Sequence, residues 1–350
     1  MSELLAKKFI ENSPDFFSDL AIDEIDDKHS AIVKSAYNKM DEKSFWNKFR
    51  EWSGQDEGVA PVDFFVDVIG SRSSFKNILR YFFIKLFKYK RETIYRSSLA
   101  DDIDAIKIVG GERLLEENKI SDTPGNARYC HISNYQVNTR FLRYIYILSQ
   151  INKYKLLNDD SIWIDVGPFY GGLQGYVKKY YKNSRMVLVD FHHQLCRSYI
   201  YLKTIYPNSN HIFPNEIKQF HDLEKLPKDS FFYVPVNYFD KIKSSSLDLF
   251  TNFYSLGEMR REHFLNYMSS STFKNSKYRY LINRFVSAPF FEKTYDSDIN
   301  VIDYLKFNDN PIYFDVFPIH HFQQFKRNLY GRDIFRNTSS SYFELISSSN

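Results

Sequence analysis

The sequence predicts an α/β protein with a doubly wound, Rossmann-like sheet and a helical N-terminal segment. Two short, continuous apolar runs, at 162–164 and 186–189, are typical of strands buried on both faces of a parallel sheet. Glycines interrupt the pattern between them, and residues 173–181 can continue as a helix. The second run ends in Asp190. This order of strand, glycine turn, helix, strand and acid is that of a βαβ unit.

The glycine turn carries the main functional signal. It puts backbone N–H groups at a helix N-terminus, and Asp190, about 20 residues downstream, is placed to accept hydrogen bonds from ribose hydroxyls. A dinucleotide turn would carry a glycine two residues after Gly167, where this chain has Phe169. The spacing of Asp165, Gly167 and Gly171 instead resembles the first motif of class I S-adenosylmethionine-dependent methyltransferases. The alternative is a strand–turn–helix with incidental glycines.

Length, composition and charge argue against several classes of protein. The 350 residues suffice for one large domain and an accessory segment, and a net charge of +4 is too small to indicate a nucleic-acid partner. Cys130 and Cys196 lie far apart, without metal-ligand spacing, so neither a disulfide framework nor a metal site is expected. The first residues lack the apolar core of a signal peptide, and no run of about 18 apolar residues occurs. We therefore expect a cytoplasmic protein.

We expect two domains, a helical N-terminal or cap region at 1–130 and a catalytic domain at 131–350. Helical spacing occurs at 31–52, 74–96 and 134–157. In the second of these helices apolar and basic side chains interleave. Such a helix either packs on its neighbours or makes peripheral contact with an anionic membrane.

Further strands alternate with helices towards the C-terminus. Helices are expected at 194–205 and 261–269, and strands at 211–213, 231–236, 247–253, 279–285, 311–319 and 342–346. The alternation indicates a doubly wound sheet, and the last two strands can form an antiparallel edge.

Several sequence blocks together resemble a family of sugar O-methyltransferases from bacterial polysaccharide and surface-glycan loci. The blocks are IDVGPFYGGL at 164–173, VLVDF at 187–191, YVP at 233–235, TNFYSLGEM at 251–259 and YLINRF at 280–285. The resemblance covers roughly 130–345. It implies a class I methyltransferase with a seven-stranded sheet that uses S-adenosyl-L-methionine to methylate a sugar, nucleotide sugar or glycan. Phe169 departs from the family, in which a small residue is common at this position.

We expect the cofactor to bind at the ends of the first strands. Adenosine-contacting groups in such folds lie on the loops at the carboxyl ends of parallel strands. The candidate cofactor-binding residues are Asp165, Gly167, Phe169, Gly171, Asp190, Phe191, His192, Asn237 and Asn252. His193 follows His192, and adjacent histidines usually point apart, so at least one of the pair would be solvated at the start of a helix.

A sugar hydroxyl is a poor nucleophile at neutral pH, so methyl transfer to it needs a base or a metal. Glu258 and His263 are the catalytic candidates, and Ser255, Glu258, Asn283 and Arg284 are the substrate-binding candidates. Each of three candidates also has a purely structural alternative. Glu258 could be a helix-start carboxylate, Arg284 a surface ion pair, and His263 a helix-surface residue. The pair His320–His321 has no carboxylate at metal-ligand spacing nearby.

Two other functions compete with methyl transfer. One is an NAD(P)-dependent oxidoreductase on a similar sheet, against which the missing Gly-x-Gly-x-x-Gly turn argues. The other is a non-catalytic, methyltransferase-like scaffold that docks to a membrane through 74–96.

Overall fold

The computed structural model describes residues 2–13, 99–120, 124, 129–286, 299–308, 310–319, 325–327, 333–335 and 341–349. Contacts divide these residues into two compact units. The first holds the described residues of 1–53, 154–317 and 340–350, and the second holds those of 54–153 and 318–339. The expected single boundary at 130 does not coincide with this division. The helices expected at 31–52 and 74–96 lie outside the described residues.

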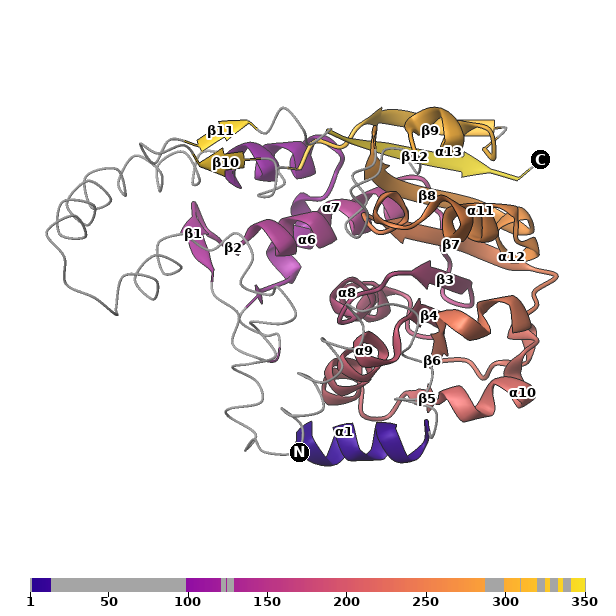
Figure 1. Cartoon of the computed structure of the whole chain (residues 1–350). Helices are drawn as coiled ribbons and strands as arrows, with labels where there is room; N and C mark the ends of the chain where they lie inside the picture. The colour runs from indigo at the N-terminus through magenta and orange to yellow at the C-terminus, as the bar shows by residue number, and fades with distance from the viewer. Residues whose placement is uncertain are drawn as a thin grey trace, which may run out of the picture. The chain divides into compact units, whose positions relative to one another are not determined.

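The first unit is built on an eight-stranded sheet with the order β5-β6-β4-β3-β7-β8-β12-β9 (Figure 1). Its strands are β3 (Ile162–Val166), β4 (Arg185–Asp190), β5 (Asn210–Ile212), β6 (Ser230–Pro235), β7 (Leu247–Phe253), β8 (Ser276–Arg284), β9 (Asn310–Val316) and β12 (Tyr342–Ser348). Neighbouring strands from β5 to β8 are parallel, whereas β12 is antiparallel to both β8 and β9. The predicted doubly wound fold with an antiparallel edge is confirmed. The sheet has eight strands instead of seven because the three-residue β5 extends it beyond β6.

The order of the strands determines where a ligand can bind. From β3 the chain runs to β4 and β6 on one side, and it then returns to place β7 on the other side of β3. In open α/β sheets ligands bind at the carboxyl ends of the strands, at such a switch point. The ends of β3, β4 and β7 are therefore the place to look for a site.

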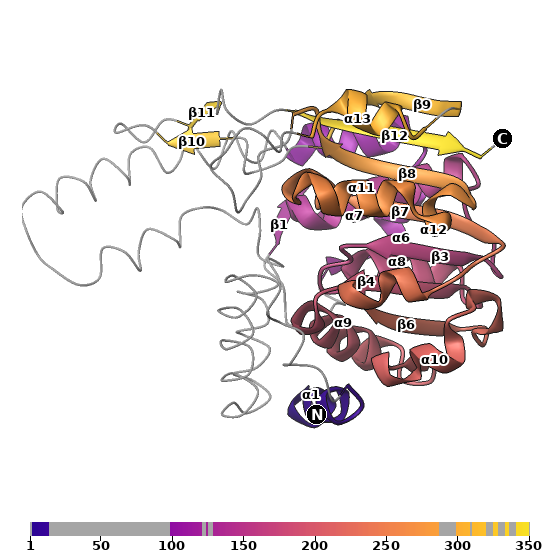
Figure 2. The same cartoon turned by 45° about the vertical axis from the view of Figure 1, so that its right-hand side comes forward.

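Helices cover both faces of the sheet. In Figures 1 and 2, α8 (Gly172–Tyr180) and α9 (His192–Ile205) lie on one face, and α11 (Arg261–Ser269), α12 (Ser271–Lys274) and α13 (Val301–Leu305) lie on the other. The short helix α10 (Ile217–Phe220) and the 3-10 turns η2 (Pro214–Glu216), η3 (Leu223–Lys225), η4 (Val236–Lys241) and η5 (Leu256–Glu258) fill the connections. All five residues of β3 are buried, as expected for a central parallel strand. One core cluster joins Ile164 and Val189 of the sheet to Phe264 of α11.

Helix α1 (Ser2–Glu11) belongs to the first unit, where it packs against α9. Phe9 is fully buried, and its ring lies 5.5–6.0 Å from the rings of Tyr199, Phe213 and Tyr233. The start of the chain is thus joined to the sheet domain by an aromatic cluster, although the sequence pattern assigned it to the N-terminal region.

The second unit combines helices with two small hairpins. It contains a helical stretch at 99–108, α6 (Glu112–Glu117) and α7 (Thr139–Lys153). Its antiparallel strand pairs are β1 (Cys130–Ile132) with β2 (Tyr135–Val137), and β10 (Phe325–Arg327) with β11 (Asp333–Phe335). The helix expected at 134–157 starts later, at Thr139, because β2 occupies the preceding residues. Within the described part of the chain no helix is both long and apolar enough to cross a membrane.

The packing of α1 predicts a large effect for Phe9→Ala. Removing a fully buried aromatic ring should lower the free energy of unfolding by about 3 kcal/mol or more. Leu4→Ala on the same helix is the matched control, since Leu4 is 70% exposed and should change stability by about 0.5 kcal/mol or less. Urea unfolding of the full chain measures both. Equal, small effects would show that α1 does not contribute to the stability of the domain.

Candidate functional site

The turn between β3 and α8 has the backbone geometry that its glycines allow. Gly167 and Gly171 have φ angles of +82° and +83°, which disfavour residues with a side chain. A Cβ atom at Gly167 would also lie 2.4 Å from the hydroxyl of Ser255, and one at Gly171 would lie 3.0 Å from the side chain of Leu202. Both glycines are therefore required for the close approach of the turn to its neighbours.

Asp190, at the tip of β4, faces this turn. Its carboxylate accepts a hydrogen bond from the backbone N–H of Phe169 at 3.3 Å and another from Phe191 N–H at 2.8 Å. A carboxylate accepts up to about four hydrogen bonds, so it can take hydroxyl donors in addition to these two. The structure thus brings together the turn and the acid that the sequence singled out.

Phe169 is held in a strained conformation. Its φ of +60° is uncommon for a bulky residue and typically costs about 1–3 kcal/mol. Its N–H donates to Asp190, its carbonyl accepts from Ser198 Oγ at 2.7 Å, and its half-buried ring packs edge-on against Tyr170 at 5.5 Å. Strained residues of this kind concentrate at functional sites.

Asp165, near the end of β3, holds the neighbouring elements of the turn together through hydrogen bonds. It is buried, and its carboxylate accepts hydrogen bonds from Thr251 Oγ1 at 2.6 Å and Gln174 Nε2 at 2.5 Å. Trp163 Nε1 in turn donates to Thr251 Oγ1 at 2.7 Å. Burial raises the pKa of Asp165 to about 7, and the nearby Asp190 carboxylate adds to the rise. Asp165 thus joins β3, β7 and α8, which is a positioning role and not a ligand contact.

Two buried asparagines join the end of β3 to the loop after β7. Asn252 Nδ2 donates to the carbonyl of Val166 at 2.7 Å, and its Oδ1 accepts from Leu256 N–H at 3.0 Å. Asn283, on β8, donates to Asn252 Oδ1 at 3.0 Å and accepts from Gly257 N–H at 3.2 Å. These amides fix the turn that carries Ser255 and Glu258, so both asparagines act in the structure as positioning residues.

Glu258 and Arg284 lie together at the ends of β7 and β8. A guanidinium nitrogen of Arg284 lies 3.5 Å from the carboxylate of Glu258. Arg284 Nε donates to the hydroxyl of Tyr342 at 3.1 Å, which fixes the guanidinium. Both charged side chains are partly exposed. The pair therefore offers a hydroxyl-bearing ligand one acceptor and several donors side by side.

Tyr254 forms an aromatic wall beside this pair. It follows β7 with a φ of +75°, so the ends of β3 and β7 each carry a strained aromatic residue. The Tyr254 ring stands edge-on to those of Tyr342 and Phe317, at 5.1 and 5.9 Å. Tyr254 and the charged pair thus lie at the carboxyl ends of β7 and β8.

The histidines differ from expectation. His263 lies on the exposed side of α11, with Nε2 3.7 Å from Glu262, so it is a helix-surface residue and the structure does not support it as a base. His192 and His193 are both buried at the start of α9, so the expectation that one is solvated is wrong. His193 stacks on Phe191 with ring centroids 6.0 Å apart. His320–His321 lies outside the described residues.

The remaining candidate, Asn237, is exposed on η4, directly after β6.

Tyr267 of α11 lies near the candidate site, although the sequence did not indicate it as a site residue. Burial and the nearby Asp190 carboxylate raise the pKa of the Tyr267 hydroxyl well above its usual value, and its ring packs 4.7 Å from Phe239. Nothing in the helical pattern of α11 distinguishes Tyr267 from an ordinary core residue.

Within the described residues, no group of three or more histidine, cysteine, aspartate or glutamate side chains could hold a metal ion. Cys130 and Cys196 form no disulfide bond.

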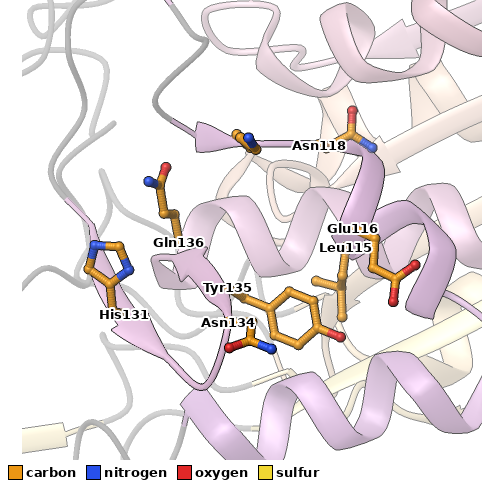
Figure 3. A pocket seen from close by; sticks show the side chains of 8 residues that line it. Leu115, Glu116, Asn118, His131, Asn134, Tyr135 and Gln136 are labelled. Atoms are coloured by element: carbon orange, nitrogen blue, oxygen red, sulfur yellow. The ribbon is translucent and has the colours of Figure 1, made fainter.

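The second unit contains a pocket of its own, about 420 Å³ in volume (Figure 3). The side chain of Tyr135 on β2 points towards Leu115 and Glu116 of α6. Amides and charged groups complete the lining, among them Asn118, Lys119, Asn134 and Gln136. None of these residues stands in a motif that the sequence analysis identified.

The strand order defines a doubly wound α/β domain, in which a glycine turn at the end of β3 meets an acid at the tip of β4. No protein-family model matches the chain, and no curated protein matches it. Among solved structures, an S-adenosylmethionine-dependent methyltransferase from Methanosarcina mazei is 11% identical, with a TM-score of 0.32 over 56% of this chain and 95% of that one. A small RNA methyltransferase is 13% identical, with a TM-score of 0.36 over 60% and 25% of the two chains. A geranyl diphosphate C-methyltransferase from Streptomyces coelicolor is 10% identical, with a TM-score of 0.34 over 59% and 80%. Likeness at this level does not identify the reaction of this chain.

The raised pKa of Asp165 predicts a pH effect on stability. Because the pKa in the folded state, about 7, lies above the ordinary value of 3.8, this carboxyl favours the folded state below about pH 4, and the stabilisation is lost as the pH rises towards 7. Asp165→Asn removes the dependence, since Gln174 can turn its amide oxygen, which has no hydrogen-bond partner, towards the new amide.

Thermal unfolding at about pH 5 and about pH 8 tests this. The variant should gain stability relative to the unchanged chain at the higher pH. Asp101→Asn, at an exposed acid, is the control. If the difference in stability between Asp165→Asn and the unchanged chain were the same at both pH values, burial would not raise the pKa of Asp165 as stated.

The asparagine pair predicts that Asn283→Ala lowers the free energy of unfolding by about 2 kcal/mol, because it leaves the Gly257 N–H without its acceptor and removes one of the two hydrogen bonds that Asn252 Oδ1 accepts. Asn266→Ala is the control, since that amide is exposed and lies 3.4 Å from Asp240. Denaturant titration distinguishes the two. Similar small losses would mean that the buried amides do not hold the turn.

Proposed function

We propose that the first unit binds S-adenosylmethionine and transfers its methyl group to a hydroxyl of a sugar, nucleotide sugar or glycan. The observation that carries the proposal is the meeting of the Asp190 carboxylate with the glycine turn at the end of β3. An acid at the tip of one parallel strand, beside a glycine turn at the tip of the next, suits the ribose of a nucleoside.

The residues present fit such a cofactor. Gly167 and Gly171 keep the turn free of side chains, and Asp190 supplies the acceptor for ribose hydroxyls. Phe191, half-exposed directly after Asp190, offers an aromatic face for adenine, and it is stacked on His193. Asp165 and Asn252 position the turn from within the protein.

The bound cofactor supplies an electrophilic methyl group, so the work left to the protein is to place the acceptor oxygen in line with it and to accept a proton. Glu258 is the group that we assign to bind the hydroxyl and accept its proton. Arg284, fixed by Tyr342, holds Glu258 and donates to other oxygens of the acceptor. Two things support a sugar as the acceptor: the polar pair beside an aromatic wall, and the resemblance of the blocks 251–259 and 280–285 to sugar O-methyltransferases.

Titration calorimetry with S-adenosylhomocysteine tests the cofactor assignment. We expect the unchanged chain to bind, and Asp190→Asn to weaken binding about 10-fold or more, equivalent to about 1.4 kcal/mol, because a donor replaces part of the acceptor. Asp160→Asn is the control, at an exposed acid before β3 on the opposite edge of the sheet. Binding of NADH in place of S-adenosylhomocysteine would overturn the proposal in favour of an oxidoreductase, and an affinity unaffected by Asp190→Asn would place the nucleoside elsewhere.

A further inference from the structure

Arg284, the last residue of β8, is a mostly buried cation. Its side chain is 13% exposed, and both Tyr342 and Glu258 contact its guanidinium. The Cζ atom also lies 5.7 Å from the centre of the Tyr342 ring. A guanidinium cannot lose its charge in a protein, and a charge that is removed from water needs a partner of opposite sign. The groups that neutralise Arg284 therefore determine which ligands suit this place.

The two contacts occupy one edge of the guanidinium. Nε donates to the Tyr342 hydroxyl at 3.1 Å, and Nη2 lies 3.5 Å from Glu258 Oε1. Nε and Nη2 share one side of this planar group. The other edge, formed by Nη1 and the second N–H of Nη2, has no partner among the described residues. The two parallel N–H groups of such an edge match the two oxygens of a carboxylate or a phosphate.

Glu258 neutralises Arg284 only in part. Among the described residues it is the one acid within 4.0 Å of the guanidinium, and their 3.5 Å separation is longer than a charge-assisted hydrogen bond of about 2.7–2.9 Å. Glu258 is also the group that we assign to accept the proton of the acceptor. In that step the acceptor oxygen gains the methyl carbon, the electron pair of the S–C bond returns to sulfur, and the proton removes the charge of Glu258. Arg284 is then left beside a neutral group.

We infer that the acceptor carries an anionic group, a carboxylate or a phosphate, that binds the second edge of the Arg284 guanidinium. This inference rests on the proposed function, and it narrows the acceptor to an acidic sugar such as a uronic acid, or to a sugar that bears a phosphate. The anion keeps Arg284 neutralised in both protonation states of Glu258. Its negative charge also favours protonation of Glu258, since a like charge nearby disfavours the carboxylate form.

Arg185 offers a matched control at the opposite end of the sheet. Its side chain is 16% exposed, its Nε donates to the carbonyl of Leu226 at 2.9 Å, and its Nη2 lies 3.3 Å from Asp160. It differs from Arg284 in its place, because it begins β4, whereas Arg284 ends β8. Replacing Arg185 should therefore carry a similar structural cost at a distance from the site.

Saturation-transfer NMR of the full chain tests the inference with sugars that share a ring and differ in the anion. The probes are glucose, glucuronate and glucose 1-phosphate, and the corresponding galactose and mannose compounds, each with and without S-adenosylhomocysteine. At least one anionic probe should bind at least about 10-fold tighter than its neutral counterpart. Arg284→Gln should weaken that binding about 10-fold or more, while Arg185→Gln leaves it unchanged. The uronates and the phosphates distinguish a carboxylate from a phosphate as the bound group.

Several results would overturn the inference. They are binding of a neutral sugar as tight as that of its anionic counterparts, no binding of any anionic probe, and equal effects of the two glutamine variants. The cofactor assignment is tested separately, by calorimetry with S-adenosylhomocysteine. A chain that binds S-adenosylhomocysteine without preferring the anionic probes would contradict this inference alone, whereas a chain that does not bind it would contradict the proposed function. Circular dichroism checks that each variant is folded.

Discussion

The hydrogen bond from the Phe169 N–H to the Asp190 carboxylate connects the ends of two neighbouring parallel strands, and the candidate site depends on it. It holds Phe169 in a left-handed conformation that few bulky residues adopt, with help from Ser198 on the carbonyl side. The strain is offset by the packing and hydrogen bonds of the turn. In return, the turn and the acid that would hold a nucleoside are positioned before any ligand arrives, which lowers the cost of ordering them on binding.

A second set of hydrogen bonds extends this order to the loop after β7. Asn252 joins the last carbonyl of β3 to the start of η5, and Asn283 adds β8 to the same network. Glu258 follows directly on the backbone that these amides fix. The glycine turn and the proposed base are therefore connected through two buried side chains, and a shift at one would change the position of the other.

Much of this was predictable from local pattern. The burial of β3 and β4 follows from their apolar runs, and the closeness of Gly167 to Asp190 follows from the rule that parallel strands end at one edge. The sequence could not distinguish a ligand contact from a positioning role, since Asp165, Asn252 and Asn283 are polar groups at strand ends in either case. Asp165, for example, accepts a hydrogen bond from Gln174, which lies outside every sequence block quoted above. The burial of His192 and His193, the exposure of His263 and the place of α1 against α9 depend on tertiary packing that periodicity alone does not specify.

The proposed function requires that an adenosine lie between the glycine turn and the tip of β4. A crystal structure of the chain grown with S-adenosylhomocysteine tests this most directly. We predict ribose hydroxyls within hydrogen-bonding distance of the Asp190 carboxylate, and the sulfur directed towards Glu258. Ligand density at another place, or a Phe169 ring that occupies the space between the turn and Asp190 while the ligand stays out, would contradict it.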